Sequence, residues 1–337
     1  MSSDPTEPHV VDMHAHASDA KARIRDAARS LGFDAIGFAR ADEPLDVEHE
    51  RYAAFVAAGR HGAMRHLAEH ADVRRRLDGP GILDGARSVV CLAKRYARAD
   101  DAQDPELARG VARYARGRDY HRFLKRRLRK LAAFVATLAP GARARALCDI
   151  EPVLERAWAA RAGLGFVGKH GLVIVPGQGS YALLGEVVTT LALPPDEPMT
   201  ERCGTCTRCL DACPTGAFDA PFRLDPRRCI AYLTIEVEGA APAEIRPGIG
   251  EHLFGCDACQ EVCPFNKTAP PPPDQTEEFR PLPLWRDRTL ADLVRADDAA
   301  FDAMSEGSPA RRPGRAAMAR NAVVVAANRL ARDEGDA

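Results

Sequence analysis

The spacing of apolar residues along the first half of the chain predicts alternating helices and strands. The clearest pattern covers residues 120–138, where leucines recur at helical spacing and basic residues occupy the other faces. Residues 19–31 predict a second amphipathic helix, and another follows Pro152, up to about residue 162. Apolar runs between turn residues predict strands at 34–39, 87–93, 145–148 and 181–193. This alternation indicates an α/β domain.

Proline-rich segments at 193–198 and 269–274 are typical of linkers and divide the chain. The residues before the first helix resemble a solvated terminus. The predicted organisation is a disordered tail (1–18), an α/β domain (19–195), a cysteine-rich domain (196–270) and a short helical C-terminal region (275–337).

The composition is that of a soluble globular protein. The chain has 337 residues, of which 46% are apolar and 28% charged, enough for about two domains. We expect no membrane span, because no apolar run is long enough for one. The N-terminal residues lack a secretory signal pattern, so the many cysteines point to the reducing cytoplasm.

Eight cysteines have the spacing of two [4Fe–4S] clusters. The first run reads Cys203-x2-Cys206-x2-Cys209-x3-Cys213-Pro214, and the second reads Cys256-x2-Cys259-x3-Cys263-Pro264, with Cys229 between them. In such runs one loop holds three corners of a cubane, and the cysteine before proline binds the other cluster. The predicted ligand sets are Cys203, Cys206, Cys209 and Cys263 for one cluster, and Cys213, Cys229, Cys256 and Cys259 for the other.

Zinc and disulfides explain these cysteines less well. A four-cysteine zinc site uses two separated pairs, and a disulfide framework suits a short secreted chain. The position of Cys229 far upstream of Cys256 indicates an insertion, residues 230–255, inside the cluster fold. Two neighbouring clusters conduct electrons, so we expect this domain to supply a redox site elsewhere in the chain.

Charge is unevenly distributed although the formal net charge is only −1. Between Arg109 and Lys130 there are ten Lys or Arg residues and one acid, Asp119. Such a run is typical either of a solvated helix face or of a surface that contacts phosphate groups, and the sequence alone leaves both open. The sequence contains no Walker A loop, dinucleotide fingerprint or nucleophile elbow, so the cofactor of the α/β domain cannot be identified from such motifs.

Several stretches resemble the epoxyqueuosine reductase family, and together they cover residues 20–332. They include Tyr114-Ala-Arg-Gly-Arg-Asp-Tyr-His121, Asp149-Ile-Glu-Pro-Val-Leu-Glu155, Ala162-Gly-Leu-Gly-Phe-Val-Gly-Lys-His170 and Gly307-Ser-Pro-Ala-Arg-Arg-Pro-Gly-Arg315. The resemblance implies a cobalamin-binding α/β domain with a nitroreductase-like fold, a ferredoxin-like domain with two [4Fe–4S] clusters, and a helical C-terminal region. It also implies reduction of epoxyqueuosine in tRNA to queuosine, with electrons passing through the clusters to cobalamin.

The resemblance assigns the proton donor for the departing epoxide oxygen to Asp149. An ordinary aspartate is ionised at neutral pH, so we expect burial or negative neighbours to raise the pKa of Asp149. As a purely structural alternative, Asp149 caps the helix that follows Pro152. The cobalamin contacts implied by position are Asp149, Val173, Leu184, Ala231, Gly255, Asp257 and Arg74. The cobalt-binding Asp-x-His-x-x-Gly motif is absent, since Asp119-x-His121 lacks the glycine.

The implied partners are the tRNA anticodon loop and an external low-potential electron donor, and we expect a monomer. Because Glu238 stands where a basic residue is expected to touch RNA, we place the RNA contacts at Arg116, Arg118, Arg122 and Arg126. Three alternatives stay open. The first keeps the class of chemistry and is a corrinoid reductase of a small molecule, such as a dehalogenase. The other two belong to different classes: a ferredoxin-type electron carrier without a reaction of its own, and an RNA-binding protein with structural clusters.

Overall fold

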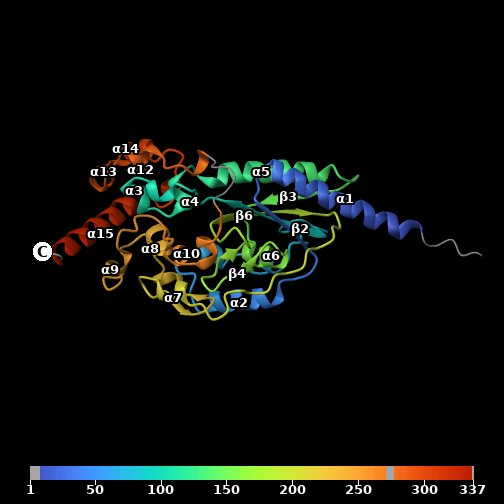
Figure 1. Ribbon diagram of the computed structural model, residues 1–337, viewed down its shortest axis with the longest axis horizontal. Coiled ribbons are helices and arrows are strands. Elements are labelled where there is room, and N and C mark those ends of the chain that lie inside the picture. Colours follow the sequence, from blue (N-terminus) through green and yellow to red (C-terminus); the bar gives the residue numbers. More distant parts are fainter. Residues whose placement is uncertain (1–7, 271–276, 336–337) are drawn as a thin grey trace, which may run out of the picture.

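A four-stranded antiparallel sheet forms the centre of the first half of the molecule (Figure 1). The computed structural model describes residues 8–270 and 277–335. The strands lie in the order β1 (Ala35–Arg40), β2 (Ser88–Arg95), β6 (Ala182–Thr189) and β3 (Ala144–Leu147), and each pairing is antiparallel. The predicted mixture of strands and helices is confirmed, although no parallel pairing links these strands. β2 is buried along its whole length, because both faces of the sheet are covered.

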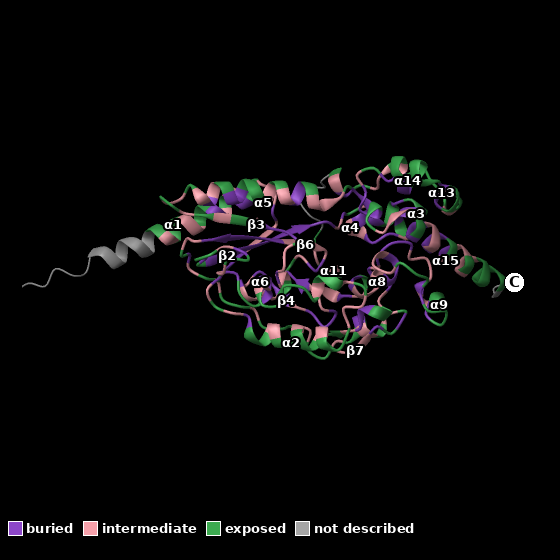
Figure 2. Ribbon diagram, turned by 180° about the vertical axis from the view of Figure 1, so that it is seen from behind, coloured by how far each residue is buried: buried purple, intermediate pink, exposed green. Residues whose placement is uncertain are grey.

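Helices α1 (Pro8–Ser30) and α5 (Tyr120–Ala136) cover one face of the sheet. Leu124, Leu128 and Leu131 of α5 are fully buried and share a core with Phe38 and Val90 of the strands. Figure 2 shows this contrast, with β2 and most of β6 buried and the outer faces of both helices exposed. Burial of the leucine stripe fixes the orientation of α5 and leaves its basic face in solvent.

The opposite face of the sheet packs against α6 (Glu155–Arg161), whose Trp158 is fully buried beside Val89 and Cys91. Farther from the sheet lie α2 (Asp46–Ala57) and a hairpin of β4 (Phe166–Val167) and β5 (Val173–Ile174). No residue of α2 is buried, because a cavity separates this helix from α6.

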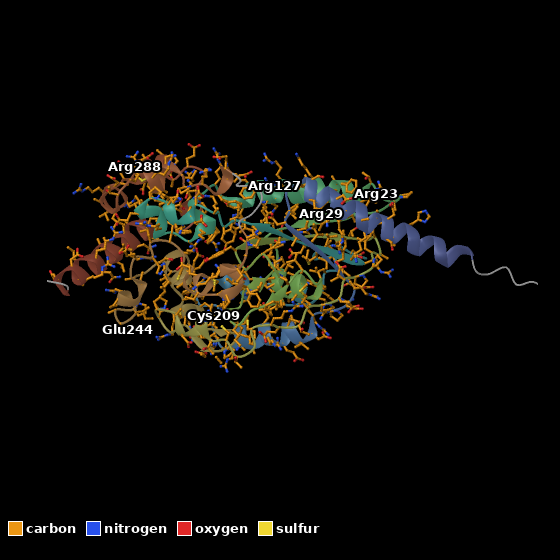
Figure 3. The ribbon with its side chains drawn as sticks, in the orientation of Figure 1. Arg23, Arg29, Arg127, Cys209, Glu244 and Arg288 are labelled. Atoms are coloured by element: carbon orange, nitrogen blue, oxygen red, sulfur yellow. The ribbon has the colours of Figure 1, made fainter. Side chains whose placement is uncertain are left out.

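The cysteine-rich domain consists of short helices and turns next to this hairpin. Cys209 lies on the side of the sheet away from Arg127 of α5 (Figure 3). Its elements are α7 (Arg208–Asp211), β7 (Phe218–Ala220), β8 (Arg223–Leu224), α8 (Ile230–Ile235), α9 (Arg246–Ile249), α10 (Ala258–Glu261) and α11 (Pro264–Lys267).

The C-terminal helices have no core of their own. Trp285 and Leu293 are fully buried in a cluster that also contains Val111 and Ala115, which precede α5, and Phe254 of the cysteine-rich domain. This shared core joins three segments that are distant in sequence. The helices that meet here are α3 (Glu106–Arg109), α4 (Arg113–Arg116), α12 (Pro283–Arg286), α13 (Leu290–Arg295), α14 (Asp298–Met304) and α15 (Gly314–Gly335).

Single 3-10 turns connect the longer elements. They are η1 (Arg65–Leu67), η2 (Val73–Arg75), η3 (Asp101–Gln103), η4 (Pro226–Arg228), η5 (Glu277–Phe279) and η6 (Pro309–Arg311). Among the residues described here, no helix is both long enough and apolar enough to cross a membrane.

The structure bears on three segments that the sequence predicts to be a tail or linkers: residues 1–18, 193–198 and 269–274. The disordered tail predicted for 1–18 is wrong from Pro8 onward, where α1 begins. Proline is accommodated at the start of a helix, and no glycine or further proline interrupts residues 9–30. Residues 1–7 and most of the predicted 269–274 linker lie outside the described residues. The 193–198 segment is packed, since Asp196 forms ion pairs with Lys21 and Arg25 at 2.7 and 2.6 Å.

Close packing of β1 against the end of α6 gives a stability prediction. A methyl group added at Gly37 would overlap the carbonyl oxygen of Ala162, which belongs to backbone and cannot rotate away. We expect Gly37→Ala to destabilise the protein by about 1–3 kcal/mol, measured by thermal or denaturant unfolding. Gly79→Ala is the matched control, because nothing lies within 4 Å of its added methyl group. Equal unfolding midpoints for the two variants would contradict this packing.

Candidate functional site

A cavity of about 1720 Å³ lies between helix α6, helix α2 and the cysteine-rich domain. This is larger than the roughly 300–1,000 Å³ of sites for drug-sized ligands, so it suits a bulky cofactor. Its wall contains six of the seven residues implied to contact cobalamin: Asp149, Val173, Leu184, Ala231, Asp257 and Arg74. Residues that are far apart in sequence are therefore brought to one surface.

Gly255 is the implied contact that does not line the cavity. Its N–H donates to Oγ1 of Thr234 at 2.9 Å, and an added Cβ would approach that of Ala112 to 2.7 Å. Its φ of 69° is also one that favours glycine. Gly255 therefore has a packing role, while the next two residues, Cys256 and Asp257, reach the cavity wall.

The side chains of the wall are held in place by contacts outside the cavity. The guanidinium of Arg74 is buried, donates to the carbonyl oxygen of His66 at 2.7 Å and lies over the ring of Tyr52. The carboxylate of Asp257 accepts from the backbone N–H of Arg113 at 2.8 Å. These contacts prepare a fixed surface before any ligand binds.

Asp149 lies at the rim of this cavity in a strained turn. Its φ is 63°, a left-handed value that is uncommon outside glycine and is found at functional sites. Its Oδ2 accepts hydrogen bonds from Nε2 of His121 at 2.7 Å and from the hydroxyl of Tyr120 at 3.1 Å. Its backbone N–H donates to Oε1 of Glu155 at 2.8 Å. The turn therefore presents one carboxylate oxygen to two side chains of α5.

The pKa values of this group differ from the expectation. Burial acts to raise the pKa of Asp149, but the hydrogen bond and positive charge of His121 outweigh it and hold that pKa below its usual value. The pKa of His121 is raised to about 9 by its hydrogen bonds with Asp119 and Asp149. The expected rise in the pKa of Asp149 is thus wrong for this structure, because the shared proton lies on the imidazole.

Two further carboxyl groups lie near Asp149, the half-buried Glu155 and the fully buried Glu186. Burial raises the pKa of Glu155 to about 7, and it raises the pKa of Glu186 of β6 well above the usual range. Neither carboxyl oxygen of Glu186 has a hydrogen-bond partner among the residues described. A buried carboxyl without a partner is stable only when protonated, so Glu186 adds no negative charge to the rim.

The cysteines of the two predicted ligand sets lie near one another within each set. Burial raises the pKa of the Cys256 thiol to about 12, and the neighbouring Cys229 and Cys213 contribute to that rise. Burial likewise raises the pKa of Cys209, with contributions from Cys263 and Cys206. All eight thiols are free of disulfides.

The surroundings of these thiols suit iron–sulfur clusters. Backbone N–H groups of Ala217 and Ala258 point at the sulfurs of Cys213 and Cys256, at 3.3 and 3.5 Å. Such N–H···S contacts stabilise the negative charge of a bound cluster and tune its potential. In the described chain no three His, Cys, Asp or Glu side chains converge on a single metal ion. A cubane binds its cysteines at four separate corners, so such convergence is not required.

The predicted RNA contacts divide into exposed and buried residues. Arg118, Arg122 and Arg126 are exposed. Arg116 is buried, pairs with Asp104 at 2.9 Å and donates to the backbone of Val111. The expectation that Arg116 contacts RNA is therefore wrong, because its charge is already paired inside the shared core.

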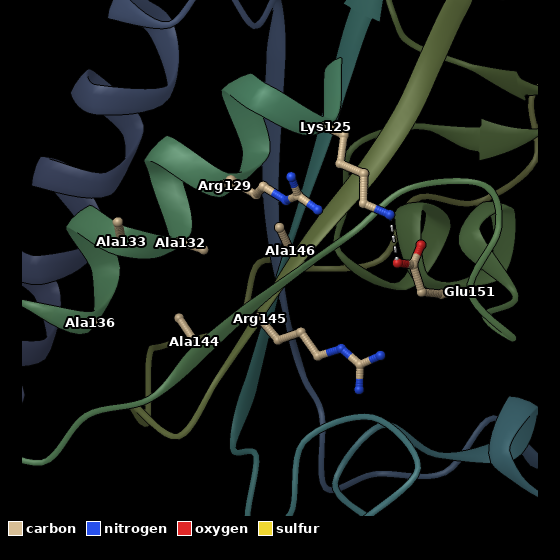
Figure 4. Close-up of a pocket in the computed structure, with 9 residues that line it drawn as sticks. All are labelled: Lys125, Arg129, Ala132, Ala133, Ala136, Ala144, Arg145, Ala146 and Glu151. Carbon is tan, nitrogen blue, oxygen red and sulfur yellow. Dashed lines mark hydrogen bonds and ion pairs between the residues drawn. The ribbon is translucent and has the colours of Figure 1, made fainter. Parts of the chain in front are cut away.

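A second, smaller hollow of about 490 Å³ lies between α5 and β3 (Figure 4). Its wall is formed by alanines together with Lys125, Arg129, Arg145 and Glu151. Lys125 forms an ion pair with Glu151 at 3.2 Å, and Glu151 also lines the large cavity. The basic surface of α5 thus extends from this hollow toward the cavity that holds Asp149 at its rim.

Sequence reasoning missed the roles of His121, Tyr120 and Glu155. The string Asp119-x-His121 drew attention only as an incomplete cobalt-binding motif. Its structural signal is the start of α5, where Asp119 caps the helix by accepting from the His121 N–H at 3.0 Å. That cap places the imidazole of His121 directly opposite the Asp149 turn.

The fold and these residues define an iron–sulfur oxidoreductase whose cluster domain adjoins a large cofactor cavity. Residues 202–266 match the family model of a 4Fe-4S double cluster binding domain, and residues 76–150 match the model described as epoxyqueuosine reductase QueG, DUF1730. Similar relatives are epoxyqueuosine reductases from Xanthomonas campestris pv. campestris (43% identical, 92% of this chain, 87% of that one) and Gloeobacter violaceus (44%, 89% and 94%). The chain belongs to the epoxyqueuosine reductase family.

Solved structures agree with this assignment. An epoxyqueuosine reductase with an epoxyqueuosine-modified tRNA-Tyr stem loop has a TM-score of 0.83 and 32% identity, covering 93% of this chain and 82% of that one. One from Bacillus subtilis, with an aspartate catalytic loop swung out of the active site, has a TM-score of 0.82, 31% identity and the same coverage, 93% and 82%. The matched family model accounts for two [4Fe–4S] clusters in residues 202–266.

The cluster assignment predicts the effect of removing one cysteine. We expect Cys256→Ala to lower the iron content from about eight to about four atoms per chain, because one cubane loses a ligand. Cys91→Ala is the control, since Cys91 is buried in the sheet core and belongs to neither ligand set. Iron analysis and the spectrum of the reduced protein measure both variants. Full iron content in Cys256→Ala would rule out this residue as a ligand.

Proposed function

We propose that this protein reduces epoxyqueuosine in tRNA to queuosine, using two [4Fe–4S] clusters and cobalamin. One observation carries the proposal: residues of the cysteine-rich domain and Asp149 line the same cavity of about 1720 Å³. Relatives that cover most of this chain are named for the same reaction. The solved relative with a modified tRNA stem loop supports RNA as the substrate.

The residues of the cavity fit a large corrinoid. Val173, Leu184 and Ala231 offer apolar contact, while Arg74, Asp149 and Asp257 offer polar groups to the edge of a flat ring. When bound, cobalamin supplies low-valent cobalt as the reductant of the epoxide. The resemblance also implies nitroreductase-like topology for the α/β layers, and we include this finer assignment in the proposal.

Cys256 indicates the order of the electron path. It lines the cavity, so we place the cluster of Cys213, Cys229, Cys256 and Cys259 beside the cofactor. The cluster of Cys203, Cys206, Cys209 and Cys263 then receives electrons from an external low-potential donor. We further propose that the protein acts as a monomer in the cytoplasm, where its thiolates stay reduced.

Asp149 is the proposed proton donor to the departing oxygen. Its carboxyl group lies at the cavity rim, and its side chain is partly open to an incoming substrate. An oxygen that leaves as hydroxide or water departs far more easily than one that leaves as an alkoxide, so an acid accelerates the reaction. The proton that Asp149 delivers must come from its hydrogen-bonded neighbours, since its own pKa is lowered.

The decisive assay is anoxic incubation of the holoenzyme with a low-potential reductant and tRNA carrying epoxyqueuosine, followed by mass spectrometry of the nucleosides. We expect loss of one oxygen only when cobalamin is present.

Asp149→Asn should retain clusters and cobalamin but lower turnover by about 10²–10⁴-fold. Asp287→Asn, an exposed acid outside the site, is the control. If epoxyqueuosine stays unchanged although the cofactors are verified as bound, the substrate is instead a small molecule. Normal turnover by Asp149→Asn would exclude Asp149 as the acid.

The exposed face of α5 is the proposed RNA surface. Arg122 and Arg126 are one helical turn apart on a helix whose first residue, Tyr120, lines the cavity. We expect Arg122→Glu together with Arg126→Glu to weaken stem-loop binding at least about tenfold and to flatten its salt dependence by about one unit per lost phosphate contact. Fluorescence anisotropy over a range of salt measures both effects. Arg295→Glu, at an exposed residue of α13, is the control, and equal affinities for the two variants would contradict the assignment.

A further inference from the structure

His121 lies between two carboxylates that it contacts with opposite edges of its ring. Nδ1 is 2.6 Å from Oδ1 of Asp119, and Nε2 is 2.7 Å from Oδ2 of Asp149. A neutral imidazole carries one N–H and one bare nitrogen, so it can donate to only one of two ionised carboxylates. The three groups therefore hold two protons together, with one of them between Nε2 and Asp149.

The arrangement is rigid on the side of Asp119. Its carboxylate caps α5, and its backbone N–H donates to the carbonyl oxygen of Gly307 at 2.8 Å. Tyr120 stacks on the imidazole with 4.2 Å between ring centroids and donates its hydroxyl to Asp149. The ring is thus held by a cap, a stacking contact and two short hydrogen bonds, while its side chain is still 32% exposed.

The stoichiometry of the proposed reaction requires two protons in each turnover. Converting the epoxide to an alkene breaks two C–O bonds, forms one C=C bond and releases the oxygen as water. The balance is one epoxide, two electrons and two protons, giving one alkene and one water. The clusters supply the electrons through the cofactor, but a single carboxyl group delivers only one proton before it must be reloaded.

We propose that His121 is the proton carrier of this site and passes the proton on Nε2 to the Asp149 carboxylate each time Asp149 protonates the substrate oxygen. The inference rests on the proposed function. The relay operates twice in each turnover, and the exposed edge of His121 recovers a proton from solvent after each transfer. His121 contacts Asp149 and not the substrate, so it acts through Asp149.

The electrostatic surroundings support proton storage at neutral pH. The pKa of His121 is raised to about 9, so the ring is charged below that pH and loses its proton above it. The charged and titratable groups around the pair are Asp119, Tyr114, Tyr120, Arg122, Cys148, Glu151, Glu155 and Arg312, the last paired with Glu236.

The pH dependence of single-turnover reduction of epoxyqueuosine tRNA tests the relay. For the wild-type holoenzyme we expect the rate to hold up to about pH 9 and then fall. His121→Gln keeps a hydrogen-bond donor for Asp149 but carries no transferable proton. We therefore expect the rate of this variant to begin to fall below neutral pH and to be about 10–100-fold lower than the wild-type rate at pH 8. Asp119→Asn should move the fall to lower pH by about one unit, because one of the charges that stabilise the imidazolium is lost.

Tyr120→Phe is the matched control for loss of a hydrogen bond to Asp149. It should lower the rate while leaving the position of the high-pH fall unchanged, because Tyr120 does not supply the stored proton. A fall near pH 9 in His121→Gln would overturn the relay, even if the rate decreased. Inactive wild-type enzyme with verified cofactors would instead count against the proposed function.

A second readout does not depend on activity. NMR titration of the enzyme with isotopically labelled histidine, with and without cobalamin, should give His121 a pKa of about 9. Asp149→Asn should lower that pKa, because the variant removes one of the two carboxylates. A His121 pKa near that of an exposed histidine, unchanged in Asp149→Asn, would overturn the inference whatever the rates show.

Discussion

The need to bring eight cysteines to two clusters determines how the parts of this molecule are joined. In the proposed assignment the ligand sets alternate along the chain, so the loop after Cys203 and the loop after Cys256 must pack against each other. The residues between Cys229 and Cys256 then leave the cluster fold and return to it. This segment packs on α15, where Asn321 donates to the carbonyl oxygens of Thr234 and Leu253 at 2.8 and 3.0 Å. The cysteine-rich domain is therefore packed directly against the C-terminal helices.

The same junction completes the cavity. Arg113, just before α5, forms ion pairs with Asp257 at 3.3 Å and Glu261 at 2.9 Å, beside two of the cluster cysteines. Its backbone N–H also donates to Asp257, which lines the cavity wall. A charge pair of this kind is costly to break inside a protein, so it fixes the distance between the cysteines and the wall. In the proposed function, electron delivery and cofactor binding thus depend on one contact surface.

The proposed proton delivery depends on the part of the cavity wall where the turn after β3 meets α5. Asp149 reaches the rim from a left-handed turn after β3, and α5 meets it with His121 and Tyr120 at its first turn. A lone buried aspartate would need a raised pKa to act as an acid. In the proposed relay, an imidazole held between two carboxylates keeps the proton beside Asp149, and Asp149 itself stays ionised until the proton moves.

The sequence alone determined the features that depend on local pattern. The leucine stripe of α5 predicted a helix, because 3.6 residues per turn fixes which side chains share a face. The cysteine spacing predicted two cubanes, because one loop must hold three corners of each. Only the tertiary structure decided which basic side chains are exposed and free to contact RNA. Arg116 and Arg122 look alike in sequence, yet one is paired inside a core and the other is exposed. The pairing of His121 with Asp149 likewise joins residues 28 positions apart, and no local pattern encodes such a distance.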